Sequence, residues 1–269
     1  MKNQKALAVV AALVASITAA QSQNVITAWS FDAGGVAAAP YNSPAPTVGT
    51  GTASVLGMNN TYNSTTSSAN ADVLASTGAS TGSGSFGWRI RGTPGNGWSS
   101  QAPIATQGAE FATSTIGYDT ITISVDINTT AQAERNLAIL YTLDATVGSP
   151  VWVNATLTSA GSVGSLQNNS TSANTITGNF VQLGSGWNNL ITASLPNAGG
   201  NANLAIEIVN ASTGVDAKNI SGTAYNNTSG NWRYDNISFS GTPVPEPSAL
   251  ALVGIGLTTL IAFRRKLKV

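Results

Sequence analysis

Acidic side chains are the first candidates for chemistry in this chain, because its 269 residues include neither histidine nor cysteine. Ser-His-Asp and Cys-His catalysis, HExxH zinc sites and disulfides are therefore excluded. Asp32 and Asp235 stand in the first and last expected strands, and carboxylates on neighbouring strands could supply the hard oxygen ligands that calcium prefers. We predict a calcium site at this pair. The alternative is that Asp235 caps a turn or pairs with Arg233 or Arg89.

A second acidic group surrounds one expected hairpin and consists of Asp126, Glu134 and Asp144. Two carboxylates at a suitable separation can hydrolyse a glycosidic bond. Acids around a hairpin are more often solvated surface groups, and nothing in the sequence marks one of these as a catalytic acid. We therefore predict no catalytic residue and no enzyme, with a secreted glycan-active enzyme as the alternative.

Tryptophan is the residue type that could bind sugars, because aromatic faces pack on the C–H side of a pyranose ring. Trp98 and Trp187 each follow a glycine, and this context favours exposed loops. These two are the predicted ligand-binding residues. Trp88, Trp152 and Trp232 are expected in the core, since a buried indole removes a large apolar area from water.

The low and mainly negative charge of the chain limits the kinds of molecule that it can bind. Only 8% of the residues are charged, and residues 24–243 hold five basic and ten acidic residues, a net charge of −5. That region lacks the electropositive surface that nucleic-acid binding needs, so we predict no nucleic-acid partner. Long-range repulsion also disfavours acidic glycans, which leaves neutral or cationic polysaccharides as the expected ligands.

The middle of the chain alternates between apolar and polar residues with a period of two. In the segment 120–127, Ile121, Ile123 and Val125 lie on one face, and the segment 137–143 repeats the pattern. Clusters of Gly, Asn, Pro and Asp separate further candidate strands at 26–32, 86–91, 151–158, 174–183, 189–195, 203–209 and 232–239. Residues 33–84 are expected to form long loops with at most one short strand. The pattern predicts an all-β, antiparallel two-sheet sandwich, or jelly roll, over residues 24–242.

The N-terminal residues 1–23 are typical of a secretory signal peptide. Lys2 and Lys5 precede an apolar run of about twelve residues, followed by small residues that suit cleavage after Ala20 or Ser22. We expect signal peptidase to act there. The alternative is an uncleaved membrane anchor.

The C-terminal residues 243–269 have three parts. Pro245-Glu246-Pro247 forms a stiff extended element. An uncharged stretch, 249–263, follows, and as a helix it would cover about 22 Å, short of a hydrocarbon core of about 30 Å. The chain closes with a basic cluster of Arg264, Arg265, Lys266 and Lys268. We predict a short C-terminal hydrophobic helix that engages the membrane, with the basic end on the cytoplasmic side.

These three parts, in this order, resemble the PEP-CTERM sorting domain. The resemblance implies that Pro245, Glu246 and Pro247 are recognised by an exosortase-type membrane transpeptidase, which cuts near them. It also implies an inner-membrane-anchored intermediate, then a cell-surface or extracellular location, in a bacterium that makes exopolysaccharide or biofilm. The expected domains are a signal peptide (1–23), a sandwich ectodomain (24–242) and a sorting tail (243–269).

The end of the ectodomain carries a further resemblance. The segment 232–241 contains Asp235-Asn236-Ile237 and resembles the closing strand of jelly-roll carbohydrate-binding and lectin-like modules. Such modules hold a structural calcium near this place, which supports the predicted site at Asp32 and Asp235. These matches are short, so they bear on the fold more than on any activity. The leading hypothesis is a non-enzymatic surface or extracellular-matrix protein, with polysaccharide as its candidate ligand. A purely structural or adhesive coat protein is the other alternative.

Overall fold

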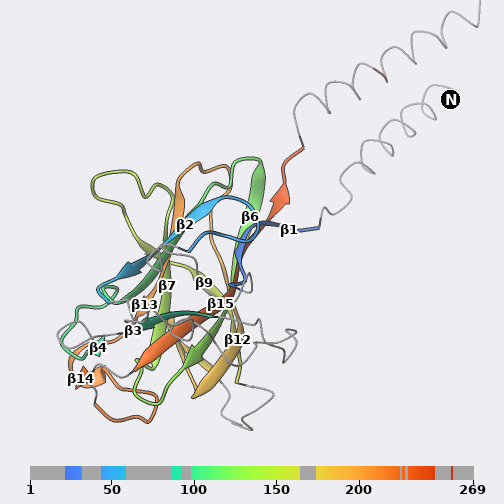
Figure 1. The fold of residues 1–269 in the computed structure, drawn as a ribbon. Coiled ribbons are helices and arrows are strands. Elements are labelled where there is room, and N and C mark those ends of the chain that lie inside the picture. The colour runs from blue at the N-terminus through green and yellow to red at the C-terminus, as the bar shows by residue number, and fades with distance from the viewer. Residues whose placement is uncertain are drawn as a thin grey trace, which may run out of the picture.

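The computed structural model describes residues 22–31, 44–58, 87–91, 98–163, 174–224, 226–227, 230–245 and 256 (Figure 1). Residues 1–21 of the predicted signal peptide, Asp32, most of the 33–84 segment and nearly all of the tail beyond Pro245 lie outside these residues. Within the described parts, no helix is long and apolar enough to cross a membrane.

The first sheet has six strands. They are β1 (Asn24–Trp29), β3 (Trp88–Arg91), β6 (Tyr118–Thr129), β9 (Thr156–Val163), β12 (Gly186–Ser194) and β15 (Asn231–Pro243). Their order is β1-β15-β6-β12-β9, with β3 also paired to β15. All of these pairs are antiparallel.

The second sheet has seven strands. They are β2 (Gly51–Leu56), β5 (Gly108–Thr113), β7 (Asn136–Thr142), β8 (Val153–Asn154), β10 (Thr175–Thr177), β11 (Phe180–Gln182) and β13 (Leu204–Asn210). Their order is β10-β11-β7-β13-β5-β2, with β8 also paired to β7. A short pair of β4 (Trp98–Ser99) and β14 (Asn226–Asn227) and a 3₁₀ turn η1 (Gly214–Asp216) complete the described elements.

The strand order confirms the predicted antiparallel sandwich and its jelly-roll form. Numbering β1, β5, β6, β7, β11, β12, β13 and β15 from one to eight gives 1-8-3-6 in the first sheet and 2-7-4-5 in the second. These two interleaved orders are those of two Greek keys wound into one jelly roll. The first and last strands are neighbours, as expected.

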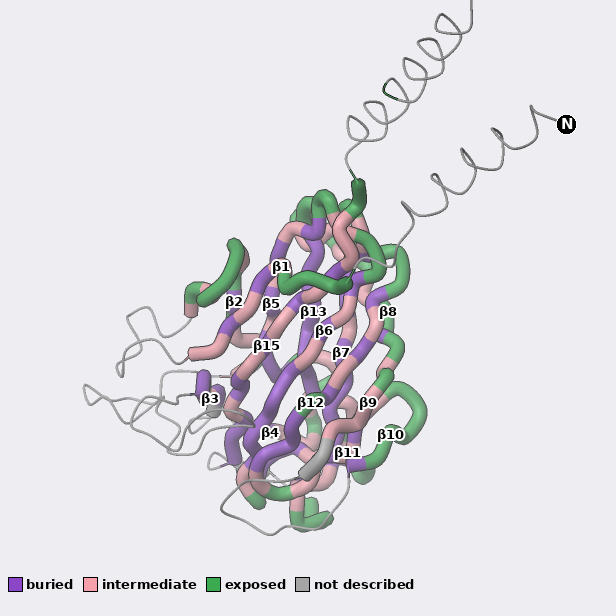
Figure 2. Tube along the Cα trace, turned by 90° about the vertical axis from the view of Figure 1, so that its right-hand side faces the viewer, coloured by how far each residue is buried: buried purple, intermediate pink, exposed green. Residues whose placement is uncertain are grey.

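The period-two pattern of β6 sets the direction of its side chains. Ile121, Ile123 and Val125 are buried, while Thr122 and Ser124 between them are partly exposed. Because successive strand residues point to opposite faces, the isoleucines face the second sheet and the hydroxyls face outward. In Figure 2, buried stretches lie mainly in the strands and exposed stretches mainly in the connecting loops.

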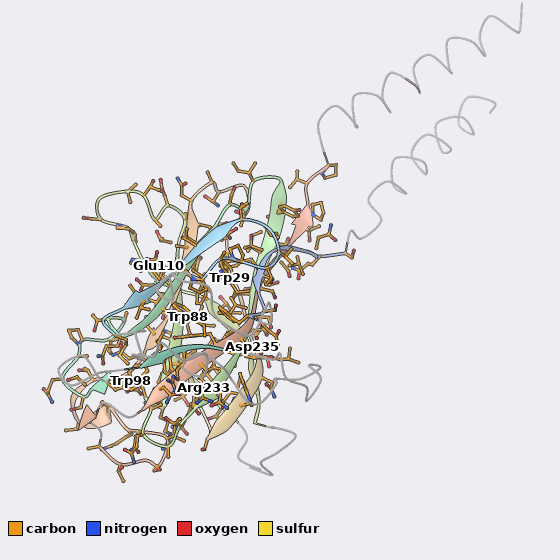
Figure 3. All side chains as sticks on the ribbon, viewed as in Figure 1. Trp29, Trp88, Trp98, Glu110, Arg233 and Asp235 are labelled. Carbon is orange, nitrogen blue, oxygen red and sulfur yellow. The ribbon has the colours of Figure 1, made fainter. Side chains whose placement is uncertain are left out.

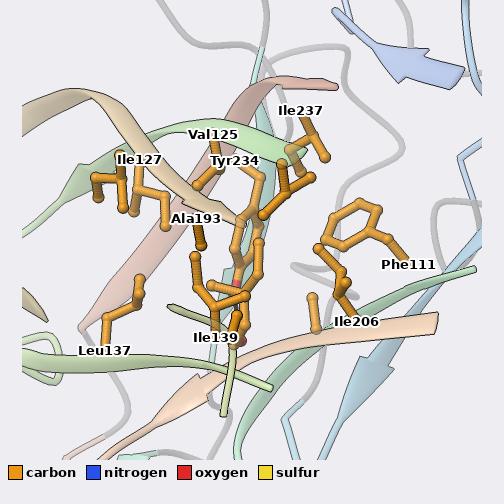
Figure 4. Close-up of a cluster of buried hydrophobic side chains, with 14 of the residues drawn as sticks. Phe111, Val125, Ile127, Leu137, Ile139, Ala193, Ile206, Tyr234 and Ile237 are labelled. Carbon is orange, nitrogen blue, oxygen red and sulfur yellow. Dashed lines mark hydrogen bonds between the residues drawn. The ribbon is translucent and has the colours of Figure 1, made fainter. Parts of the chain in front are cut away.

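An aromatic cluster joins the two sheets. Trp29 and Trp88 of the first sheet meet Phe111 of the second edge to face, at ring-centroid distances of 5.3 and 5.7 Å. The Tyr234 hydroxyl crosses from β15 to donate to the Ile208 carbonyl of β13 at 3.3 Å. Figure 4 shows apolar side chains from both sheets packed around this tyrosine. Burial of this interior is the main source of stability in a chain without disulfides.

Candidate functional site

The outer face of the first sheet can be mapped from strand register, because residues directly opposite on antiparallel strands share a face. Six serines and threonines form two rows across β12, β6 and β15. One row is Thr192, Ser124 and Ser238, and the other is Ser194, Thr122 and Ser240. All six are half-buried, so their hydroxyls lie at the surface. We call these six residues the hydroxyl face.

Farther along the same strands, the outer face becomes charged. Asp126 of β6 lies opposite Asp235 of β15, and Asn128 lies opposite Arg233, which in turn lies opposite Arg89 of β3. We call Arg89, Asp126, Arg233 and Asp235 the charged row. Arg233 and Asp235 are labelled in Figure 3. Both aspartates are only 2% exposed, whereas the two arginines are half-buried.

Backbone bulges supply hydrogen-bond donors to Asp126. Its Oδ1 accepts from the Leu190 backbone N–H at 2.7 Å, and its Oδ2 accepts from Asn236 Nδ2 at 3.0 Å. The ladders on both sides of β6 shift register at these points, and Leu190 and Asn236 have φ of +58° and +47°. A bulky residue in the left-handed region is strained, and such strain concentrates at functional sites.

The predicted calcium site is only partly described. Asp32 lies outside the described residues, and Asp235 Oδ1 accepts from the Asn236 backbone N–H at 2.8 Å. Within the described part of the chain, no group of three or more acidic, histidine or cysteine side chains could hold a metal ion. Calcium at Asp32 and Asp235 therefore stays a prediction.

The predicted exposure of Trp98 and Trp187 is wrong. Both side chains are 0% exposed: Trp98 lies in β4 and packs on Trp232 at a centroid distance of 4.6 Å, and Trp187 lies in β12 opposite Asn128. Each tryptophan belongs to a strand rather than to a glycine-rich loop. Neither face is open for a sugar ring in this structure. Trp232 is buried as predicted, and its Nε1 donates to the Glu134 carbonyl at 2.9 Å.

The three acids of the expected hairpin occupy different environments. Asp126 belongs to the charged row, whereas Glu134 is fully buried and its Oε1 accepts from the Asn136 N–H at 2.7 Å and from Ser212 Oγ at 3.0 Å. Asp144 is half-buried in the loop after β7, and hydrogen bonds from the Thr146 hydroxyl and N–H lower its pKa. These contacts fit structural roles in the strand and loop around them.

An acidic pair that sequence reasoning did not single out lies on the second sheet. Glu110 of β5 is directly opposite Glu207 of β13. Burial and the Glu110 charge raise the pKa of Glu207 to about 7, and burial raises the pKa of Glu110. Each residue is the single acid in its strand, but only the register reveals that the two face each other.

The sorting element begins where the sandwich ends. β15 remains paired with β6 up to Pro243, which lies opposite Tyr118, and the Val244 N–H donates to the Gly117 carbonyl at 2.8 Å. Pro245 is exposed and follows directly. Glu246, Pro247 and the basic cluster lie outside the described residues. No flexible spacer separates the last strand from Pro245.

The fold and this junction define a jelly-roll ectodomain that leads directly into a C-terminal segment. Residues 243–266 match the PEP-CTERM protein-sorting motif. The chain carries this motif, which implies processing by an exosortase, export, and a cell-surface or extracellular location.

A comparison with curated protein sequences gives no match. Among solved structures, the chain is similar to the CBM22-1 and GH10 modules of Clostridium thermocellum endo-1,4-β-D-xylanase 10B, complexed with xylohexaose. The identity is 12% and the TM-score 0.28, over 61% of this chain and 23% of that one.

Proposed function

We propose that this protein is a non-enzymatic component of the cell surface or extracellular matrix, and that its sandwich binds a neutral or cationic polysaccharide. The observation that carries the proposal is the sorting motif attached without a spacer to the last strand of the jelly roll. In this scheme signal peptidase releases the N-terminus, and the tail holds an inner-membrane intermediate until exosortase processing. A secreted glycan-active enzyme and a purely structural coat protein are the competing functions.

The hydroxyl face is the surface we assign to the polysaccharide. Its six side chains are half-buried and are spaced across three neighbouring strands. The Thr122 hydroxyl donates to Gln23 Oε1 and the Thr192 hydroxyl shares a hydrogen bond with Thr158, so the four serines are the groups we expect to donate to and accept from sugar hydroxyls along an extended chain. The face carries no charge of its own, which suits a neutral ligand. The net charge of −5 over residues 24–243 (five basic, ten acidic) favours neutral or cationic chains over acidic ones.

Processing in the native host tests the sorting part of the proposal. We expect mass spectrometry to find a mature N-terminus at Gln21 or Gln23 and no Arg264-to-Val269 peptide. Glu246→Ala should retain the tail, whereas Thr242→Ala, four residues upstream, should be processed normally. A basic tail still attached to the wild-type protein in a host with active exosortase would overturn this assignment.

Glycan binding tests the second part. Ser124→Arg places a long side chain on the hydroxyl face, and Thr52→Arg places the same side chain on the outer face of the second sheet. On a glycan array we expect Ser124→Arg to lose binding and Thr52→Arg to keep it. If no glycan binds at millimolar concentration, the coat-protein function is the better one. Release of reducing sugar would instead support an enzyme.

A further inference from the structure

The Glu110–Glu207 pair lies in the middle of the second sheet. β13 and β5 are paired over Leu204–Val209 and Gly108–Thr113, so the two glutamates face the same side at directly opposite positions. Their neighbours on the core side, Phe111 and Ile206, are buried, which directs both carboxylates to the outer face. Like charges directly opposite in an antiparallel sheet are destabilising.

The strands of the second sheet provide no compensating charge. Glu110 and Glu207 are the only charged residues in β2, β5, β7, β8, β10, β11 and β13. The residue beside Glu207 on β7 is Leu140, and the residue beside Glu110 on β2 is Ser54. A cation that balances this pair must therefore come from outside these strands.

Burial makes the imbalance more costly. Glu207 is 8% exposed and Glu110 is half-buried. In the part of the chain that the structure describes, neither carboxylate has a hydrogen bond or ion pair with another residue, so the ends of both side chains are reached only by solvent. A buried charged group without a partner is unfavourable, and burial accordingly raises the pKa of both glutamates. Taking up a proton removes this unfavourable charge at low pH, and a bound cation would balance it at higher pH.

We propose that Glu110 and Glu207 bind a divalent cation of the calcium type on the outer face of the second sheet. Two carboxylates offer four hard oxygen atoms, and the exposed Ser54 hydroxyl lies in the same row. A charge of +2 neutralises the pair, which a single ammonium group cannot do. Water would supply the remaining oxygen ligands, because calcium takes six to eight of them.

This site differs from the pair Asp126 and Asp235 on the first sheet. There, hydrogen bonds from Leu190, Asn236 Nδ2 and the Asn236 N–H already occupy carboxylate oxygens. The first sheet also contains arginines in β3 and β15. Substitution of Glu207 should therefore remove the response of the melting temperature to Ca²⁺, whereas substitution of Asp235 should leave it.

The test is the melting temperature of the full chain in mild nonionic detergent, with millimolar CaCl₂ or with chelator. At about pH 8 we expect Ca²⁺ to raise the melting temperature, because a ligand bound only by the folded state stabilises it. At about pH 5, below the pKa of Glu207, protons compete with the ion and the increase should largely disappear. Equilibrium dialysis should show fewer bound Ca²⁺ ions per chain for Glu110→Gln/Glu207→Gln than for the wild type.

Single variants locate the ion. Glu207→Gln should lose the response to Ca²⁺, and in chelator it should be at least as stable as the wild type, which separates loss of binding from loss of folding. Asp235→Asn should keep the response. An unchanged melting curve with Ca²⁺ at pH 8 would overturn the proposal, as would a response that survives Glu207→Gln. A proton-sharing pair without metal affinity would give the former result.

Discussion

The buried acids on the outer faces of the two sheets differ in the hydrogen-bond donors and basic residues around them. The strands of the first sheet contain three arginines and three aspartates, and those of the second contain two glutamates and no basic residue. Asp126 and Glu207 are buried to a similar depth, at 2% and 8% exposure. Asp126 accepts hydrogen bonds from two bulges, whereas Glu207 has no such donor among the described residues. A buried acid is thus structural where the backbone supplies donors, and a binding or pH-sensitive group where it does not.

The largest effect is expected at Trp187, which lies beside the charged row on the first sheet's outer face. Because its indole is fully buried, Trp187→Ala should lower the free energy of unfolding by about 3–5 kcal/mol, as much as Trp232→Ala in the core. Urea denaturation measures both. A loss below about 1 kcal/mol would mean that Trp187 is exposed in solution, and the difference in burial between the hydroxyl face and the charged row would disappear.

Asp126→Ala should have the next largest effect. It leaves the Leu190 N–H and Asn236 Nδ2 without their acceptor, which costs about 2–3 kcal/mol of stability. Ser124→Ala, two residues away on the same strand and face, serves as the matched control and should change stability by less than about 0.5 kcal/mol. Equal effects of the two substitutions in denaturant unfolding would contradict a structural role for Asp126.

Glu207→Gln should have the smallest effect and the opposite sign. The pKa of Glu207 is about 7 in the folded protein against an ordinary value of 4.5, so between these pH values the folded state binds more protons than the unfolded state. In chelator, the free energy of unfolding should therefore fall as pH rises through that window and then level off. Glu207→Gln should reduce this slope and stabilise the protein at about pH 8 by about 1 kcal/mol. A slope equal to that of the wild type would show that Glu207 ionises normally.

Most of the fold could be predicted because its signal is local. The alternation in β6 and β7 directly reports which side chains face the core, and residues 243–266 form a contiguous motif. The adjacency of β1 and β15 followed from the jelly-roll expectation.

The candidate sites depend on information that the sequence does not contain in local form. Glu110 and Glu207 are 97 residues apart and meet only through the register of β5 and β13. The glycines before Trp98 and Trp187 suggested exposed loops, but packing from distant strands buries both indoles. The donors to Asp126 arise from bulges, which no residue pattern announces.

The place of β15 has a mechanical consequence. β15 is 13 residues long and is flanked by β6 on one side and by β1 and β3 on the other, and the sorting tail continues from its end. A force applied through the tail would pull β15 along its own axis and load the ladder hydrogen bonds on both sides together in shear, rather than opening them one at a time. An ectodomain held by its last, central strand is therefore expected to resist drag from flow or from a bound polymer better than one held by an edge strand.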